Sequence, residues 1–433
     1  MRVMAASRAL IALSLAGLLA NCAGGAAPPA MPAQSVSERS IPLRSTAGSL
    51  DRTFGHDGKA IFTLALNPIA TVVQADGRIV IAGDVGSAPG QVAVARLLPN
   101  GKLDQTFGSG GTRNVNMWNV ASLTLLGNGD ILLGGIASTG KDAALVRILP
   151  GGTLDSSFGN GGAVQFDYVA NSSNGVLAAV AQPDGSVVAG GFGLATNSDV
   201  YLTSLARFDA SGKADPNFGT NGVVALDLVG GVTALGLQSD GKILVCGGFI
   251  TPATSLVVRF LHNGMLDRTD TGGALVAVAH TGSLTFGGTN EFQLDGKLVQ
   301  WKSVVGKGGG HYVKIVRLLR DNKPDRTFKS LLFAFASPAF GQANDVEIAS
   351  DGSLLAGGGG DRSGYEVFGL ARLRATGPLD RAFGRDGRVT TSFGSGAEVT
   401  ALALQADGRI IAAGTVSSGG SQSQLAVARY LGN

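Results

Sequence analysis

The chain has 433 residues, of which 44% are apolar, 15% are charged and 67 are glycine. This apolar content excludes disorder for most of the chain, so the glycines indicate tight turns within a packed protein. The 34 basic residues nearly balance the 31 acidic residues, and no basic stripe of the kind that binds nucleic acid is visible.

Residues 1–22 have the order of a secretory signal. Arg2 and Arg8 precede an apolar run from Ala9 to Ala20, and small residues follow. The run is too short to cross a bilayer, which takes about 20 apolar residues. We therefore expect the chain to be exported.

The end of this signal resembles a bacterial lipobox, in which the cysteine, here Cys22, is lipidated and becomes the mature N-terminus. Asn21 departs from the small residue usual before that cysteine, and ordinary cleavage near residues 23–25 is the alternative. The expected destinations are the outer membrane as a lipoprotein, the periplasm or the exterior. Contact with a membrane is expected only through this lipid.

Residues 23–47 are rich in Pro, Ala and Ser, which predicts a flexible linker outside the fold. Removing the signal leaves 32 basic and 31 acidic residues. Cys246 is then the one cysteine within the domain, in an apolar run, so we expect a buried small side chain and no disulfide.

From residue 48 onward, one element returns at a mean interval of about 55 residues, which is typical of repeat arrays. It reads Leu-Asp-x-x-Phe-Gly, is degraded in two copies, and has its aspartates at Asp51, Asp104, Asp155, Asp215, Asp267, Asp325 and Asp380. In the degraded copies Asp270 replaces the Phe and Lys329 replaces the Gly. Residues 48–433 are therefore expected to form one domain of seven repeats.

Each repeat continues with a pattern that predicts about four antiparallel strands. A short β-rich run follows the Phe-Gly element, and an alternating segment then ends in an Asp-Gly or Asn-Gly turn, for which we expect the type I′ hairpin. The partner strand, a variable loop and a strand ending in arginine complete the unit. The seven arginines are Arg96, Arg147, Arg207, Arg259, Arg317, Arg372 and Arg429.

Seven units of four strands predict an all-β fold, a seven-bladed β-propeller of four-stranded antiparallel blades. The pattern Leu-Asp-x-x-Phe-Gly, then Gln-x-Asp-Gly-Lys-Ile and Ala-Arg-Leu, resembles the bacterial delta-60 repeat family over residues 48–431. The resemblance implies a propeller-like protein of the cell envelope or exterior. It implies no catalytic residues.

Residues that recur in all blades are expected to serve the blades. The repeated Asp would cap turn amides, the Phe would fill space between sheets, and the Arg would pair with an acidic group or a carbonyl. The four histidines show no metal-binding spacing, and no P-loop or nucleophile elbow is present. We thus expect no cofactor, no metal site and no enzyme chemistry, with a hydrolase or lyase at the mouth of the channel as the alternative.

The ends of the repeat array are complementary. Residues 48–64 supply one strand without its own blade, and residues 398–431 supply three strands without an outer edge. We predict that the N-terminal strand completes the last blade and closes the ring. Residues 264–329 are predicted to form a divergent blade because of the two degraded copies.

The expected function is binding of a protein, peptide or glycan by a monomer. In a four-stranded blade, the links between strands two and three and from four to the next blade share one rim, and here these links vary while the other rim repeats. Aromatic, polar and charged residues on the variable rim are the predicted contacts. They are Trp118, Asn119, Tyr168, Asp199, Tyr201, Trp301, Lys307, His311, Tyr312, Arg362 and Tyr365.

Overall fold

The computed structural model describes residues 46–86, 90–195, 200–238, 240–248, 254–268, 276–279, 290–293, 295–306, 309–321, 323–329, 331–336, 341–362, 365–417 and 423–432. These residues form strands, turns and loops, without a helix in any of the described ranges. The predicted lipobox at Cys22 lies outside them.

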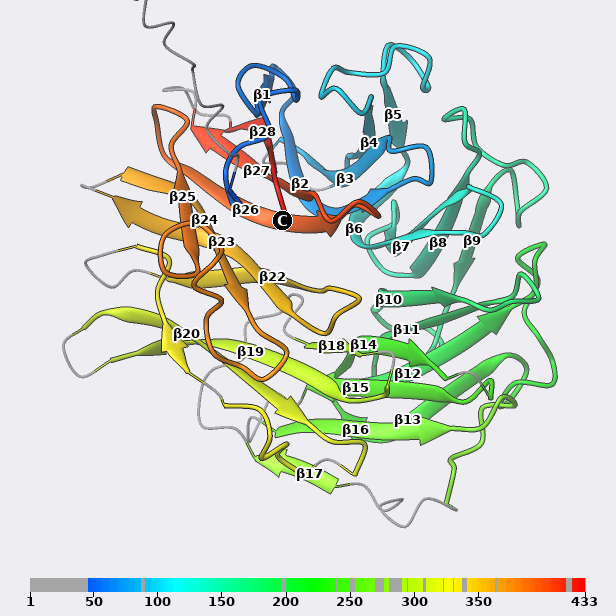
Figure 1. Ribbon diagram of the computed structural model, residues 1–433. Coiled ribbons are helices and arrows are strands. Elements are labelled where there is room, and N and C mark those ends of the chain that lie inside the picture. The colour runs from blue at the N-terminus through cyan, green and yellow to red at the C-terminus, as the bar shows by residue number, and fades with distance from the viewer. Residues whose placement is uncertain are drawn as a thin grey trace, which may run out of the picture. The chain divides into compact units, whose positions relative to one another are not determined.

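Seven four-stranded antiparallel sheets make up the protein, and we number them as blades in chain order (Figure 1). Blade 1 is β2 (Leu66–Val73), β3 (Ile79–Val85), β4 (Val92–Leu97) and β5 (Thr112–Val115). Blade 2 is β6 (Met117–Leu125), β7 (Ile131–Ala137), β8 (Ala143–Ile148) and β9 (Ala163–Phe166). Blade 3 is β10 (Asn174–Ala181), β11 (Val187–Leu194), β12 (Tyr201–Phe208) and β13 (Val223–Val229).

The remaining blades repeat this order. Blade 4 is β14 (Gly231–Leu237), β15 (Ile243–Gly248), β16 (Thr254–Phe260) and β17 (Val276–Ala279). Blade 5 is β18 (Asn290–Phe292), β19 (Leu298–Val305), β20 (His311–Leu318) and β21 (Leu332–Phe333). Blade 6 is β22 (Gln342–Ile348), β23 (Leu354–Arg362), β24 (Tyr365–Leu373) and β25 (Arg388–Thr391), and blade 7 is β26 (Ala397–Leu404), β27 (Ile410–Ser417), β28 (Ser423–Tyr430) and β1 (Lys59–Phe62).

The first strands of consecutive blades contact one another in the order β2, β6, β10, β14, β18, β22 and β26, and β26 returns to β2. The sheets therefore form a closed ring, with these first strands innermost. The predicted seven-bladed β-propeller is confirmed.

The ring is closed by a strand from the beginning of the chain. β1 pairs with β28 along its whole length, from Lys59 opposite Ala428 to Phe62 opposite Leu425, and Figure 1 shows the two strands side by side. The Gly48 amide donates to the Leu431 carbonyl at 2.7 Å, and the Leu431 amide donates to the Ser49 carbonyl at 2.9 Å. This pairing is the closure that the sequence predicted.

Alternating side chains of each strand fill the two spaces beside its blade. In β3, Ile79 and Ile81 pack with residues of blade 7 such as Ile411, whereas Val80 packs with residues of blade 2 such as Leu133. All these side chains are fully buried. Burial of one such side chain contributes about 1.5–3 kcal/mol, which explains why strands covered on both faces are almost continuously apolar.

The Asp-Gly turns differ from the predicted type I′ hairpin. In the first turn, Gly77 has φ +81° while Asp76 is not among the residues with positive φ. The Gly77 amide donates to the Gln74 carbonyl at 2.9 Å, and the Asp76 carboxylate accepts from the Arg78 amide at 3.0 Å. The loop is a type I turn followed by a glycine bulge, because the aspartate caps the next amide and only the glycine takes the left-handed conformation.

Blade 5 departs most from the repeat among the described sheets. β18 has 3 residues and β21 has 2, whereas the other strands have at least 4. Asp270, one of the two substitutions behind the predicted divergence, lies outside the described residues. Lys329 still donates its amide to the Thr376 carbonyl of the next blade at 2.7 Å, as Gly159 does to Ser211, so the backbone contact is kept.

Candidate functional site

The Asp-Gly turns and the Phe-Gly elements lie on one rim of the propeller, which we call the turn rim. On this rim, the repeated aspartates and arginines form a set of hydrogen bonds and ion pairs, which we call the staple. In blade 2, the Asp155 carboxylate accepts from the Ser157 amide at 3.0 Å and from Arg147 Nε at 2.6 Å. Arg147 also donates to the Ala210 carbonyl of blade 3 at 2.6 Å. The equivalent arginine of the last blade, Arg429, reaches the Pro99 carbonyl of blade 1.

The repeated phenylalanine completes this staple. Phe158 is fully buried, and the Arg147 guanidinium lies 4.5 Å from the centre of its ring. The same stacking occurs in six blades, with Phe54, Phe107, Phe158, Phe218, Phe328 and Phe383. The capping by Asp, the pairing of Arg and the burial of Phe agree with the sequence predictions, and the arginine contacts also join adjacent blades, so the repeated residues are structural.

Two of the predicted contact residues lie in the core. Tyr168 is 5% exposed and packs edge-on against Phe166 with ring centres 5.0 Å apart. Trp301 is 4% exposed and packs with Phe333 and Val346. Core packing accounts for both side chains, so no binding partner is needed to explain them. We leave both residues out of the proposed binding surface.

Other predicted residues lie on separate blades of the opposite rim, which we call the loop rim. Tyr201 is half-buried and packs edge-on against Phe192 at 5.0 Å in blade 3, and His311 and Tyr312 begin β20 in blade 5. Asp199 and Lys307 lie outside the described residues. Arg362 and Tyr365 pair through their backbones where β23 turns into β24, and their side chains are not described.

Trp118 is the large aromatic residue that the loop rim exposes most clearly, at 39% of its surface. It occupies a β-bulge between Met117 and Asn119, and the Asn119 side-chain oxygen accepts from the Ile136 amide at 3.1 Å. The Trp118 carbonyl accepts from the Gly90 amide at 2.9 Å. The bulge is thus held by hydrogen bonds from its own blade and from blade 1.

The indole of Trp118 lies close to a turn that requires glycine. Gly140 has φ +75°, and a side-chain carbon at this residue would lie 3.3 Å from the Trp118 ring. The glycine therefore lets the ring lie flat against the turn between β7 and β8. A rigidly held, partly exposed Trp is the kind of anchor that dominates binding interfaces.

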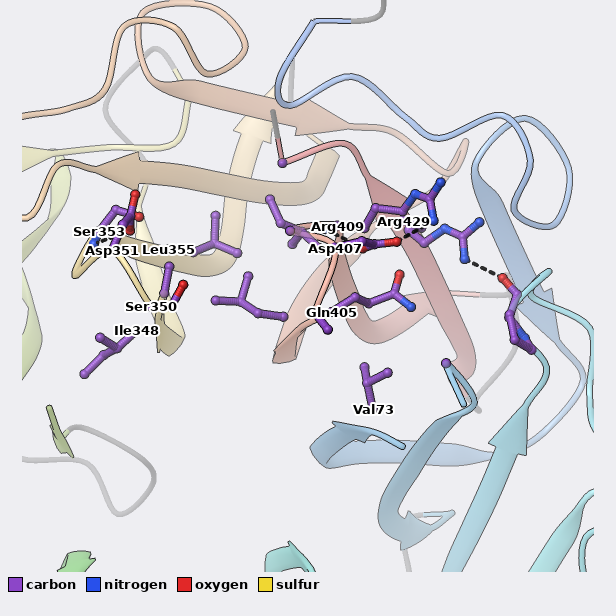
Figure 2. Close-up of a pocket in the computed structure, with 18 of the residues that line it drawn as sticks. Val73, Ile348, Ser350, Asp351, Ser353, Leu355, Gln405, Asp407, Arg409 and Arg429 are labelled. Carbon is purple, nitrogen blue, oxygen red and sulfur yellow. Dashed lines mark hydrogen bonds and ion pairs between the residues drawn. The ribbon is translucent and has the colours of Figure 1, made fainter. Parts of the chain in front are cut away.

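A cavity of about 1010 Å³ opens on the turn rim where β2, β22 and β26 end. Figure 2 shows side chains of blade 6, such as Asp351 and Ser353, and of blade 7, such as Gln405 and Arg409, around the same space. Val73 of blade 1 contributes to its wall. The sequence interpretation assigned no contact residue to this rim.

Three carboxyl groups of half-buried residues gather on the innermost strands of blades 5 and 6. Asp345 accepts from the Leu402 amide at 2.7 Å and from the Val346 amide at 2.8 Å, while burial raises its pKa to about 6. Burial and the charge of Asp345 raise the pKa of Glu347 to about 8. Burial and the charges of Glu347 and Asp345 raise the pKa of Glu291 to about 9. Within the described ranges, no group of three or more His, Cys, Asp or Glu side chains has a metal-binding arrangement.

Cys246 is buried and unpaired, which confirms the prediction of a small buried side chain. Burial raises the pKa of its thiol to about 12, so the reactive thiolate is suppressed. None of the described residues belongs to a helix long and apolar enough to cross a membrane.

The fold and the stapled rim define the class: the protein is a seven-bladed β-propeller built from repeats. Six segments match the family described as "Domain of unknown function (DUF5122) beta-propeller", at residues 74–107, 126–158, 182–218, 238–269, 349–383 and 405–433. These six segments are similar to DUF5122 β-propeller repeats, and the delta-60 repeat predicted from the sequence is a related β-propeller repeat family.

Solved structures with a similar fold have varied descriptions. A protein of unknown function from Dyadobacter fermentans is 11% identical, with a TM-score of 0.42, 87% of this chain covered and 98% of that one. The polysaccharide lyase Uly1 is 11% identical, with a TM-score of 0.49 and coverage of 91% and 94%. A puromycin hydrolase is 14% identical, with a TM-score of 0.44 and coverage of 86% and 53%. No curated protein matches the sequence.

Proposed function

We propose that the protein is an exported binding propeller that recognises a protein, peptide or glycan through its loop rim. The observation that carries this proposal is Trp118, which is partly exposed on a bulge held by hydrogen bonds from two blades. Such an anchor is preorganised, so binding loses little side-chain entropy. His311, exposed at the start of β20, lies on the same rim.

The proposed location is the cell envelope or exterior, with Cys22 as the lipid attachment site. Fractionation of cells that express the full chain tests this part of the proposal. Lipidation would be supported if the parent protein is found in the membrane fraction and the Cys22→Ala variant is found outside it. Equal distribution of both proteins would contradict it.

Trp118→Ala tests the binding surface. The purified parent and variant would be compared on an array of glycans and on immobilised envelope proteins from the native host. We expect loss of Trp118 to weaken a partner by about 1–2 kcal/mol, and Tyr312→Ala or Tyr365→Ala to weaken it similarly. Ile61→Ala, which removes an exposed side chain of the outer strand β1, is the control. Equal binding by the parent and all three loop-rim variants would refute the assignment.

A further inference from the structure

The cavity on the turn rim exists because blade 6 lacks two side chains that blades 1 and 7, which share the cavity, both have. Blades 1 and 7 carry Gln74 and Gln405 before the Asp-Gly turn, and Arg78 and Arg409 after it. Blade 6 has Ala349 and Ser353 at these positions. The small residues leave the space that the three blades then enclose.

The neighbouring glutamines contribute polar groups without partners. Gln74 is 9% exposed, and the side-chain oxygens of both Gln74 and Gln405 are buried without a hydrogen bond in the described structure. In blade 3, by contrast, the oxygen of Gln182 accepts from the Ser186 hydroxyl at 2.8 Å. The oxygen of Gln293 in blade 5 is also unpartnered, but that residue does not line the cavity.

An unpartnered buried polar group costs about 1–3 kcal/mol, which a ligand that donates a hydrogen bond would recover when the terminal amide turns toward the cavity. Two such carboxamides on adjacent blades therefore favour a ligand with several donors. The carboxylate of Asp351 adds an acceptor, since it is exposed, accepts from the amide and the hydroxyl of Ser353, and forms no ion pair with the described residues.

The arginines around the cavity are already paired. Arg372 pairs with Asp380 at 2.8 Å, Arg429 pairs with Asp51 at 2.9 Å, and Arg409 pairs with Asp407 at 2.6 Å. None of the arginines that line the cavity is left over to select an anion. The wall also contains apolar side chains, including Val73, Ile348 and Leu404 at the ends of the innermost strands.

We infer that this cavity is a second binding site, separate from the loop rim, for a neutral saccharide. A sugar supplies many hydroxyl donors, has apolar C–H faces and carries no charge, which matches the carboxamides, the apolar wall and the paired arginines. The volume of about 1010 Å³ lies at the upper end of ordinary ligand pockets, about 300–1,000 Å³, so it suits a segment of two or more rings. The ligand is either a free disaccharide or the end of a longer chain.

Ser353→Arg is the first variant that tests this inference. It restores the residue that blades 1 and 7 use, and the new side chain has Asp380 available as Arg78 has Asp104 at 3.0 Å. The variant should fold and fill the cavity. Ser186→Arg makes the same change at the equivalent position of blade 3, away from the cavity, and is the matched control.

Gln405→Leu is the second variant. It removes an unpartnered polar group while keeping most of the volume, so the melting temperature should stay equal or rise. Binding should nevertheless weaken, because the hydrogen-bonding carboxamide is lost. A lower melting temperature would show that the carboxamide serves the fold and would overturn the inference.

Titration calorimetry with maltose, cellobiose and their hexasaccharides measures the affinity, with triglycine as the peptide comparison. We expect at least one saccharide to bind with Kd below about 1 mM, and both Ser353→Arg and Gln405→Leu to weaken it at least about tenfold. Ser186→Arg and Trp118→Ala should keep the parent affinity, which separates this site from the loop rim. Absence of saccharide binding, binding of triglycine alone, or unchanged affinity in Ser353→Arg would overturn the inference.

Discussion

Asp51 joins the beginning of the propeller to its end, and we predict that Asp51→Ala destabilises the fold by about 3–5 kcal/mol, the cost of breaking a buried ion pair by removing one partner. Its carboxylate accepts from Arg429 Nε at 2.9 Å, from the Thr53 amide at 3.0 Å and from the Thr53 hydroxyl at 2.7 Å. The substitution leaves Arg429, which is 4% exposed, without this charge partner.

The corresponding change in melting temperature is modest because the domain is large. Unfolding entropy of about 2.1 cal/mol/K per residue gives about 0.8 kcal/mol/K for residues 45–433. A loss of 4 kcal/mol therefore lowers Tm by about 5 °C. Differential scanning calorimetry of the parent and the variant measures this shift.

Asp155→Ala is the matched control, since Asp155 makes the same contacts inside blade 2. Both variants should lose similar stability. Their local effects should differ, because β9 follows β8 in the same sheet along the chain, whereas β1 is held in blade 7 by non-covalent contacts alone.

Amide hydrogen exchange distinguishes the two variants. In Asp51→Ala, the amides of β1 should exchange faster than those of the other outer strands, because β1 opens locally. In Asp155→Ala, β9 should stay close to its parent protection. Equal changes in β1 and β9 would refute the view that β1 is a separately attached closing strand.

Three further outcomes follow from packing and charge. Phe107→Ala should cost about 3–5 kcal/mol by chemical denaturation, since the ring is fully buried between blades 1 and 2. Glu347 and Glu291 have raised pKa values and so bind protons more tightly in the folded state. Their contribution to the free energy of unfolding should be fullest near pH 4.5 and be lost as the pH rises toward about 8 and 9. Glu347→Gln should make Tm fall less steeply over this pH range. Cys246 should resist a thiol reagent in the folded protein at pH 8 and react on addition of denaturant, and rapid labelling without denaturant would contradict its burial.

The fold could be predicted because the same short patterns recur, and each pattern specifies one turn or one strand of the blade. Asp-Gly turns join neighbouring strands, strand-end arginines mark the third strand, and the unmatched strands at the two ends can only complete each other. The prediction of the turn type was wrong. The choice between type I′ and type I with a bulge depends on the carboxylate of residues such as Asp76, which accepts a hydrogen bond from the Arg78 amide.

Side-chain orientation was harder to predict than strand position. The sequence interpretation placed Trp301 at the start of a long hairpin tip, but β19 continues to Val305, and Trp301 pairs with Ile315 inside the sheet. The cavity depends on three blades meeting in space, which no single repeat encodes. Aligning the repeats shows its cause, however, because Ala349 and Ser353 stand out against the glutamines and arginines of blades 1 and 7.

The offset between sequence repeat and blade bears on how such a ring grows by gene duplication. Each repeat begins with the Phe-Gly element and outer strand of one blade and continues with the first three strands of the next, as β1 and then β2 to β4 show. A tandem copy of one repeat therefore inserts a complete blade whose strands come from two neighbouring copies. The terminal strands still complete each other whatever the number of copies, so selection can test a ring of a new size without first evolving a new closure.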